Sequence, residues 1–159
     1  MKKINPIRKV VTPIDFSDNA GLVVESAAYI AGNFGAELHV IFIVQNFEDY
    51  SGFFVPQMNV PNIEHELFVG AEEQMESFCR EHGSHFDKAG ISVVKKVLVG
   101  DVSEKIVEYA AEENADMVIM GTHGYKGLER IMFGSVADKV VKSASCPVLT
   151  INPYTCCDD

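Results

Sequence analysis

The sequence predicts an α/β fold, a doubly wound sheet of five parallel strands in the order 3-2-1-4-5. Short apolar runs rich in β-branched residues alternate with longer segments whose apolar residues recur at helical spacing. The run at 37–44 (ELHVIFIV) is almost continuously apolar, as expected of a strand covered on both faces. The length of 159 residues, 47% of them hydrophobic, suits one domain, 1–159, with a core at 8–152, an inserted loop at 45–61 and a tail at 153–159.

The first half of the chain alternates strand and helix, with boundaries set by local signals. The expected elements are a strand at 8–14, a helix at 18–34, a strand at 37–44 and a long helix at 62–89. Ser17 or Asp18 is the expected cap of the first helix, and Gly35 is its expected end. We expect Gly83 and Ser84 to kink the long helix or to end it early.

The second half repeats this alternation. The expected elements are strands at 91–99, 115–120 and 147–151 and helices at 102–114 and 135–145. Right-handed crossovers leave few topologies for such a chain. In the order 3-2-1-4-5 the reversal lies between strands one and four, where ligands bind outside the carboxyl ends of the strands. The turn 13–17 (PIDFS) and the glycine-bearing loop 121–134 are therefore expected to face one crevice.

The segment after the fourth strand, GTHGYKGLERIMFGS at 121–135, carries the strongest functional signal. Gly121 and Gly124 allow tight turns and let main-chain N–H groups approach a phosphate. Gly134 and Ser135 open the next helix, whose unpaired N–H groups and positive dipole end favour an anion. The spacing G-x2-G-x9-G-S is neither a Walker A loop nor G-x-G-x-x-G. It predicts phosphate binding, with glycines that serve only turns and caps as the alternative.

These features together resemble the universal stress protein family from about residue 8 to residue 151. The matching segments are Pro13–Ser17 (PIDFS), Phe42–Val44 (FIV), Val99–Asp101 (VGD), Met120–Gly124 (MGTHG), Gly134–Ala137 (GSVA) and Cys146–Leu149 (CPVL). The resemblance implies a Rossmann-like fold of the adenine nucleotide α-hydrolase type. The complete glycine loop is similar to that of the ATP-binding branch, whereas other members lack it.

The resemblance also implies a nucleotide site. Adenine and ribose would border Pro13, Ile14, Asp15 and the backbone of Ile43, while Met120, Gly121, His123, Gly124, Gly134, Ser135 and Val136 would hold the ribose and phosphates. Ile14 departs from the Thr or Val more usual in the family, which hardly alters a pocket lined by backbone. Mg²⁺ would be held mainly by phosphate oxygens and water. No catalytic residue and no metal-ligating side chain is assigned.

Several residues of this site keep two interpretations. Asp15 either accepts hydrogen bonds from ribose or adenine or caps the helix near Ser17. His123 is expected to contact phosphate through its backbone, since a lone histidine in a loop is weak evidence for acid–base catalysis. Lys126 and Arg130 either add charge to the phosphate loop or are ordinary solvated side chains.

Two further segments bear on partners. The family dimerises through its last strand, and the apolar edge at 148–151 predicts a homodimer by two-fold antiparallel pairing. The loop at 45–61 is rich in aromatic residues. It is expected to form a local cluster over the second helix, a lid over the adenine or a docking surface for a partner.

Charge and composition exclude several functions. The formal net charge of −10 lacks the basic footprint of a nucleic-acid-binding protein. No apolar signal core follows the basic start, and the longest strongly apolar run, 40–44, is far too short to span a bilayer. The four cysteines form no C-x-x-C pair, which favours reduced thiols. We therefore expect a cytoplasmic protein without a nucleic-acid or membrane partner.

The sequence thus predicts an ATP-binding stress-response or regulatory module. We expect it to be dimeric, to signal to an unidentified protein partner and to hydrolyse ATP at most slowly. Two other functions stay open. One is an adenylyl- or phosphoryl-transfer enzyme on the same fold, although only Asp15, His123 and Lys126 offer chemistry in the crevice. The other is a dimeric interaction protein that binds AMP, cyclic AMP or no nucleotide.

Overall fold

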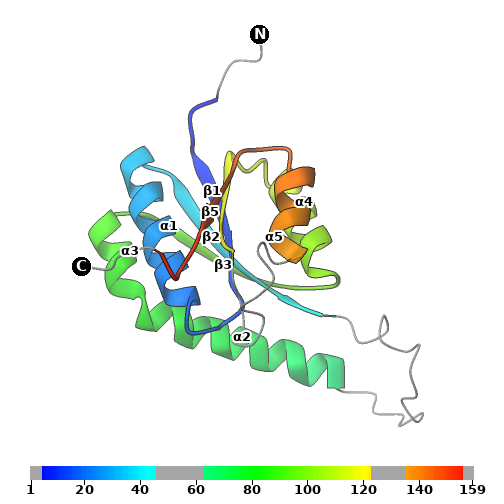
Figure 1. Ribbon diagram of the computed structural model, residues 1–159. Helices are drawn as coiled ribbons and strands as arrows, with labels where there is room; N and C mark the ends of the chain where they lie inside the picture. Colours follow the sequence, from blue (N-terminus) through cyan, green and yellow to red (C-terminus); the bar gives the residue numbers. More distant parts are fainter. Residues whose placement is uncertain (1–4, 46–62, 123–134, 156–159) are drawn as a thin grey trace.

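The computed structural model describes residues 5–45, 63–122 and 135–155, which form a five-stranded sheet between two layers of helices (Figure 1). The strands are β1 (Lys9–Pro13), β2 (Glu37–Val44), β3 (Val93–Val99), β4 (Met117–Gly121) and β5 (Val148–Ile151), and all pair in parallel. The helices are α1 (Ala20–Phe34), α2 (Ile63–Glu81), α3 (Gly83–Ala89), α4 (Val102–Glu112) and α5 (Ser135–Ser143). The order β3-β2-β1-β4-β5 confirms the predicted doubly wound fold class.

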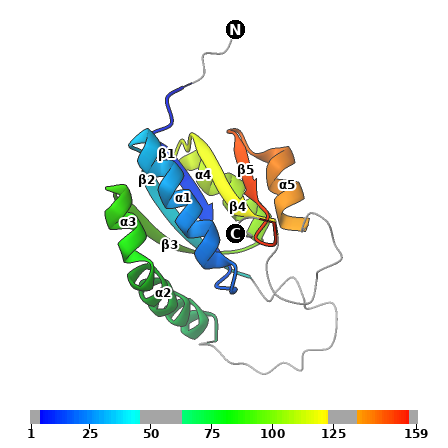
Figure 2. The same cartoon turned by 60° about the vertical axis from the view of Figure 1, so that its left-hand side comes forward.

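The helices divide between the two faces of the sheet. Figures 1 and 2 show α1, α2 and α3 on one face and α4 and α5 on the other. Successive side chains of a strand point to opposite faces. In β1 and the turn after it, Val10 and Ile14 accordingly enter the core under α1–α3, and Val11 enters the core under α4 and α5. Both layers therefore anchor the central strand β1, whose carboxyl end leads into the candidate site.

Two of the predicted boundaries in the helices are confirmed. The long helix expected at 62–89 ends early, because α2 stops at Glu81 and α3 starts at Gly83. Gly35 ends α1 in the left-handed region at φ 63°, with its N–H donated to the carbonyl of Gly32. A residue without Cβ adopts this conformation without steric cost.

The predicted cap of α1 is wrong. The N-cap position is Asn19, whose side chain makes no capping hydrogen bond, and α1 starts at Ala20. Ser17 contributes backbone groups instead: its carbonyl accepts from the Ala20 N–H at 3.0 Å, and its N–H donates to Asp15 Oδ1 at 3.0 Å. Residues 15–20 therefore form two successive turns, and the helix begins only at Ala20.

Several predictions fall outside the described residues. They concern the aromatic loop, of which only Gln45 is described, and most of the glycine loop, which is described only at Gly121 and Thr122. Among the helices that are described, none is long and apolar enough to cross a membrane.

Candidate functional site

The carboxyl ends of β1 and β4 lie at the reversal of strand order. These two strands pair only at Val10 with Met117 and Val11 with Val118, whereas β1 pairs with β2 along its whole length, as far as Pro13. The last residues of β1 and β4 therefore lie beyond their mutual pairing. Doubly wound sheets bind their ligands at this position.

The turn after β1 holds Asp15 at the edge of this region. The Ile14 N–H donates to the carbonyl of Ile41 at 2.9 Å, which continues the contact with β2 past the end of β1. Asp15 is exposed, and its Oδ1 accepts the Ser17 N–H at 3.0 Å in an Asx turn. The carboxylate thus has a local role before α1, and its role toward ribose or adenine stays a prediction.

Phe16, in the same turn, has an unusual backbone. Its φ of 57° lies in the left-handed region, which costs an L-residue about 1–2 kcal/mol. The ring of Phe16 packs against two other rings, that of Phe42 in β2 at a centroid distance of 4.5 Å and that of Phe78 in α2 at 5.7 Å. Packing from two elements therefore supports a conformation that local preference disfavours.

Two buried hydroxyls flank this turn without a hydrogen-bond partner in the described part of the chain. They are Thr12 Oγ1, on a residue that is 0% exposed, and Ser17 Oγ. A buried polar group that is left unsatisfied costs about 1–3 kcal/mol. Such groups are rare in folded proteins, and both of these lie beside the carboxyl end of β1.

Three predicted site residues offer a ligand mainly their backbone. The side chains of Ile14, Ile43 and Met120 are 8%, 5% and 5% exposed and belong to the two cores. Ile43 lies past Ile41, the last residue of β2 that pairs with β1. Its backbone edge toward β1 is therefore not covered by that strand, as the prediction of a backbone contact requires.

At the carboxyl end of β4, the neighbouring strand β5 anchors the start of the glycine loop. The carbonyl of Ile151 accepts hydrogen bonds from the N–H and the Oγ1 of Thr122, at 2.9 and 3.3 Å. Gly121, the last residue of β4, is half-buried. Ser135 is exposed at the start of α5, where helical N–H groups lack intrahelical acceptors, and Val136 packs against the core under α4 and α5.

The structure thus places the described part of the predicted site on neighbouring elements. Pro13, Ile14, Asp15, Ile43, Met120, Gly121, Ser135 and Val136 lie at or just past the carboxyl ends of β1, β2 and β4 or in the first turn of α5. His123, Gly124 and Gly134, like Lys126 and Arg130, lie outside the described residues. Their roles stay predictions.

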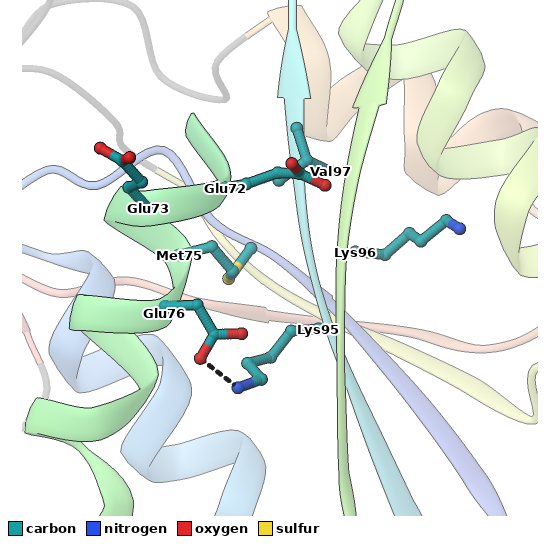
Figure 3. Close-up of a pocket in the computed structure, with 7 residues that line it drawn as sticks. All are labelled: Glu72, Glu73, Met75, Glu76, Lys95, Lys96 and Val97. Carbon is teal, nitrogen blue, oxygen red and sulfur yellow. Dashed lines mark hydrogen bonds and ion pairs between the residues drawn. The ribbon is translucent and has the colours of Figure 1, made fainter. Parts of the chain in front are cut away.

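A groove elsewhere on the surface does not suit a nucleotide. It has a volume of about 350 Å³ and lies between α2 and the edge strand β3 (Figure 3). Three glutamates line it, and Glu76 pairs with Lys95 at 2.6 Å. Figure 3 shows Lys96 pointing away from α2. The carboxylates would repel phosphates, and β2 separates the groove from β1.

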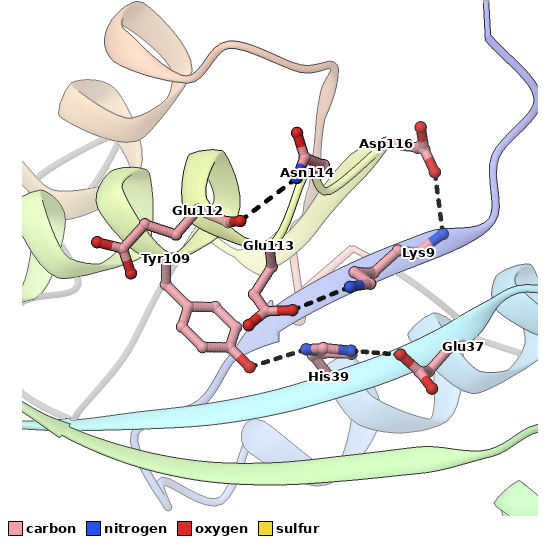
Figure 4. Close-up of polar contacts among 8 residues, drawn as sticks. All are labelled: Lys9, Glu37, His39, Tyr109, Glu112, Glu113, Asn114 and Asp116. Atoms are coloured by element: carbon pink, nitrogen blue, oxygen red, sulfur yellow. Dashed lines mark hydrogen bonds and ion pairs between the residues drawn. The ribbon is translucent and has the colours of Figure 1, made fainter.

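A second polar cluster lies at the opposite, amino-terminal edge of the sheet (Figure 4). His39 is 3% exposed; its Nε2 lies 2.6 Å from Glu37 Oε1 and its Nδ1 lies 2.8 Å from the Tyr109 hydroxyl. An ionised carboxylate only accepts, so Nε2 donates the hydrogen of its contact with Glu37. In the tautomer whose single hydrogen is on Nε2, Nδ1 accepts from the Tyr109 O–H. Burial raises the pKa of Tyr109 to about 12, and the nearby carboxylates of Glu113 and Glu37 add to this effect.

Charged groups around this histidine are also partnered. Lys9 Nζ donates to Glu113 Oε2 at 2.9 Å, and this hydrogen bond lowers the pKa of the Glu113 carboxyl from its ordinary value. The Asp116 carboxylate accepts the N–H groups of Arg8 and Lys9 at 2.9 and 3.1 Å. The cluster therefore ties the starts of β1, β2 and β4 to the end of α4.

The described residues offer no ready metal or thiol chemistry. In ranges 5–45, 63–122 and 135–155 there is no group of three or more His, Cys, Asp or Glu side chains placed to hold a metal ion. Cys79 and Cys146 are free thiols, and burial raises the pKa of both, that of Cys79 to about 11. Thiols with a raised pKa are poor nucleophiles at neutral pH.

Sequence reasoning did not single out two features of this site, the strained Phe16 and the buried hydroxyl of Thr12. A phenylalanine at positive φ contradicts local preference, so no local pattern indicates it. Threonine in an apolar strand is an ordinary β-branched residue, and only packing shows that its hydroxyl is unpartnered. The PIDFS motif at 13–17 indicated where the site lies, but it did not indicate the strained backbone of Phe16 or the unpartnered hydroxyl of Thr12.

Comparison with known proteins gives a consistent result. The pattern of the Universal stress protein family matches residues 6–152. Over 148 residues the chain is 34% identical to Universal stress protein MJ0531 of Methanocaldococcus jannaschii, covering 92% of this chain and 83% of that protein. The solved structure of universal stress protein UspA from Lactobacillus plantarum superposes with a TM-score of 0.78 at 21% identity, covering 93% and 99% of the two chains.

Two further structures with this fold contain nucleotides. One is a universal stress protein in complex with cAMP, with a TM-score of 0.64 and 22% identity over 94% of this chain and 99% of that one. The other is the universal stress protein from Archaeoglobus fulgidus in complex with dAMP, with a TM-score of 0.62 and 23% identity over 93% and 100%. These likenesses show that the three chains share a fold.

Proposed function

The chain belongs to the universal stress protein family, and we propose that it is an ATP-binding member whose nucleotide lies across the carboxyl ends of β1 and β4. In this proposal Pro13, Ile14, Asp15 and the backbone of Ile43 border the adenine and ribose. Met120, Gly121, His123, Gly124, Gly134, Ser135 and Val136 hold the ribose and phosphates.

The observation that carries this proposal is the arrangement of groups where β1 and β4 are no longer paired. The exposed carboxylate of Asp15 lies on one side of this opening, suited to accept from ribose hydroxyls or the adenine amino group. Gly121 and the first turn of α5 lie on the other side. The N-terminus of a helix stabilises an anion, so the phosphates belong on that side. A hydrogen-bond acceptor on one side and a helix N-terminus on the other thus match the adenosine and the phosphates of a nucleotide.

The complexes of related folds with cAMP and dAMP support the adenine part of the proposal. ATP rather than a monophosphate is proposed because the glycine loop is long and ends at a helix N-terminus. Mg²⁺ would be held through phosphate oxygens and water.

We further propose that the protein works in the cytoplasm as a regulatory dimer, with at most slow hydrolysis. Leu149 in β5 is 39% exposed, and β5 pairs on one side with β4 in the described sheet, which leaves an edge suited to a second copy. The sequence offers no general base poised for an attacking water molecule, so any hydrolysis should be slow.

Isothermal titration calorimetry with ATP, ADP, AMP and cyclic AMP, with and without Mg²⁺, tests the function. We expect ATP to bind with a Kd well below about 1 mM, and Gly121→Val and Gly134→Asp to weaken binding more than about tenfold. Gly70→Ala is the matched control, because Gly70 is exposed in α2 with open space around it. It should bind as the wild type does.

The four titrations also separate the alternatives. If AMP or cyclic AMP binds more tightly than ATP, the protein is a monophosphate binder and the phosphate part of the site is wrong. The ATP-binding function is falsified if none of the four nucleotides binds below about 1 mM. Single-turnover assays with labelled ATP and candidate acceptors would reveal a transferase.

A further inference from the structure

The backbone of Phe16 is the most unusual feature of the turn between β1 and α1. Two described non-glycine residues have positive φ, Phe16 at 57° and Asn114 at 53°. Asparagine adopts this region readily, whereas a bulky aromatic residue there is an outlier. Local preference therefore explains Asn114 but not Phe16.

Two rings from different elements hold Phe16 in place. The ring of Phe42 in β2 lies at 4.5 Å with an interplanar angle of 41°, and that of Phe78 in α2 lies at 5.7 Å and 71°. These are favourable separations for aromatic pairs. All three side chains pack against the core under α1–α3. Releasing the backbone of Phe16 would pull its ring out of this arrangement.

The same backbone links Asp15 to Ser17. The Asp15 Oδ1 accepts the Ser17 N–H at 3.0 Å across the Phe16 residue, so a change of φ at Phe16 would separate these groups. We propose that Phe16 is a positioning residue, which the rings of Phe42 and Phe78 hold in a left-handed conformation so that Asp15 meets the nucleotide. This inference rests on the proposed function and concerns the adenine and ribose side of that site.

Two substitutions at one position separate positioning from simple packing. Phe16→Ala removes the ring but keeps a Cβ, so the backbone relaxes to negative φ and Asp15 moves. Phe16→Gly also removes the ring, but glycine adopts positive φ as readily as negative φ. Affinity falls with the fraction of molecules in the competent conformation, so we expect a loss of about tenfold or more for the alanine variant. The glycine variant should bind within about threefold of the wild type.

If Phe16 served only packing, the two variants would rank differently in their affinity for ATP. Glycine would then bind no better than alanine, because both lose the same ring and glycine is the less stable of the two. The measurement is calorimetry with ATP and Mg²⁺ on the full chain, at a temperature where all variants are folded. Phe86→Leu is the matched control, since Phe86 is a buried ring of the same core that lies in α3. It should lower stability and leave affinity unchanged.

A second readout does not depend on nucleotide. Amide hydrogen exchange at Ser17, followed by NMR, should be faster in Phe16→Ala than in Phe16→Gly, because the Asx turn is lost in the first and kept in the second. Equal exchange and equal affinity in the two variants would overturn the inference while leaving ATP binding intact. If the wild type bound no nucleotide, the proposed function would fail, and exchange at Ser17 would still decide whether Phe16 holds the turn.

Discussion

Within the described part of the chain, buried polar groups are hydrogen-bonded at one end of the sheet and left without partners at the other. At the amino-terminal edge, the buried His39 is hydrogen-bonded through both ring nitrogens, to Glu37 and to Tyr109. At the carboxyl-terminal edge, the hydroxyls of Thr12 and Ser17 are buried and have no partner among the described residues. Both edges belong to the same strands, so the contrast does not come from a difference in fold.

Backbone conformation and strand pairing also differ between the amino-terminal and the carboxyl-terminal edges of the sheet. The carboxylate of Asp116 accepts two backbone N–H groups at the start of β1, next to the residues that pair β1 with β4. At the other end this pairing has stopped, and Phe16 carries a strained φ of 57°. Proteins tend to break local rules where they bind ligands and to obey them elsewhere. The comparison therefore supports the proposal that the carboxyl-terminal edge binds the nucleotide while the amino-terminal edge contributes stability.

The largest effect is expected from breaking the amino-terminal cluster with His39→Ala. This change opens a cavity at a residue that is 3% exposed and leaves the Tyr109 hydroxyl without its hydrogen-bond partner. We expect the free energy of unfolding to fall by about 2–4 kcal/mol. Denaturant unfolding followed by circular dichroism measures it.

Nucleotide affinity provides the second half of this test. If the two edges are independent, His39→Ala should bind ATP as the wild type does at a temperature where both are folded, because mutational effects at distant sites add. A tenfold loss of affinity with little loss of stability would mean that the amino-terminal cluster serves binding, and the division between the edges would be wrong.

A smaller, pH-dependent effect is expected from Tyr109. The pKa of this residue is raised from 10 to about 12, so the folded protein favours the neutral phenol. The resulting stability is complete below pH 10 and is lost as the pH rises from 10 toward 12. In that window the wild type should lose about 2 kcal/mol more than Tyr109→Phe, which has no phenol to ionise.

Denaturant unfolding of the wild type and of Tyr109→Phe at pH 9 and at pH 11.5 measures this difference. The other tyrosines are present in both proteins, so their contribution cancels in the comparison. Parallel pH profiles would show that Tyr109 is not shielded from solvent. The amino-terminal edge would then be less tightly closed than its hydrogen bonds indicate.

Most of the fold could be predicted from the sequence, because it depends on repeating local signals. Apolar runs such as 37–44 and the helical spacing of 18–34 indicated the elements, and the alternation of strand and helix indicated a parallel sheet with helices on both faces. Gly35 ends α1 as expected, since its left-handed φ of 63° follows from the residue type. The cap of α1 was wrong because the Ser17 carbonyl accepts the Ala20 N–H in a tight turn, so the helix starts at Ala20 with Asn19 at its N-cap.

The candidate site was only partly accessible to such reasoning. Asp15 and Gly121 could be placed at the reversal of strand order, since topology determines where strands end. The contact of Phe16 with Phe78 joins positions 62 residues apart in the chain, and the partners of His39 come from β2 and α4. Packing between distant segments decides these features, and no local pattern reports it.

The smallest effect, and the only stabilising one, is expected from Thr12→Val. Valine has nearly the shape of threonine, so the change removes the unpartnered hydroxyl of a side chain that is 0% exposed without opening a cavity. The free energy of unfolding should rise by about 1 kcal/mol, because the hydroxyl no longer has to be desolvated without compensation. Thr150→Val is the matched control, since Thr150 is a half-buried threonine in β5. Its change should stay within about 0.5 kcal/mol in denaturant unfolding. A loss of stability in Thr12→Val would mean that this hydroxyl has a partner in the folded protein, and the two edges of the sheet would then no longer differ in this respect.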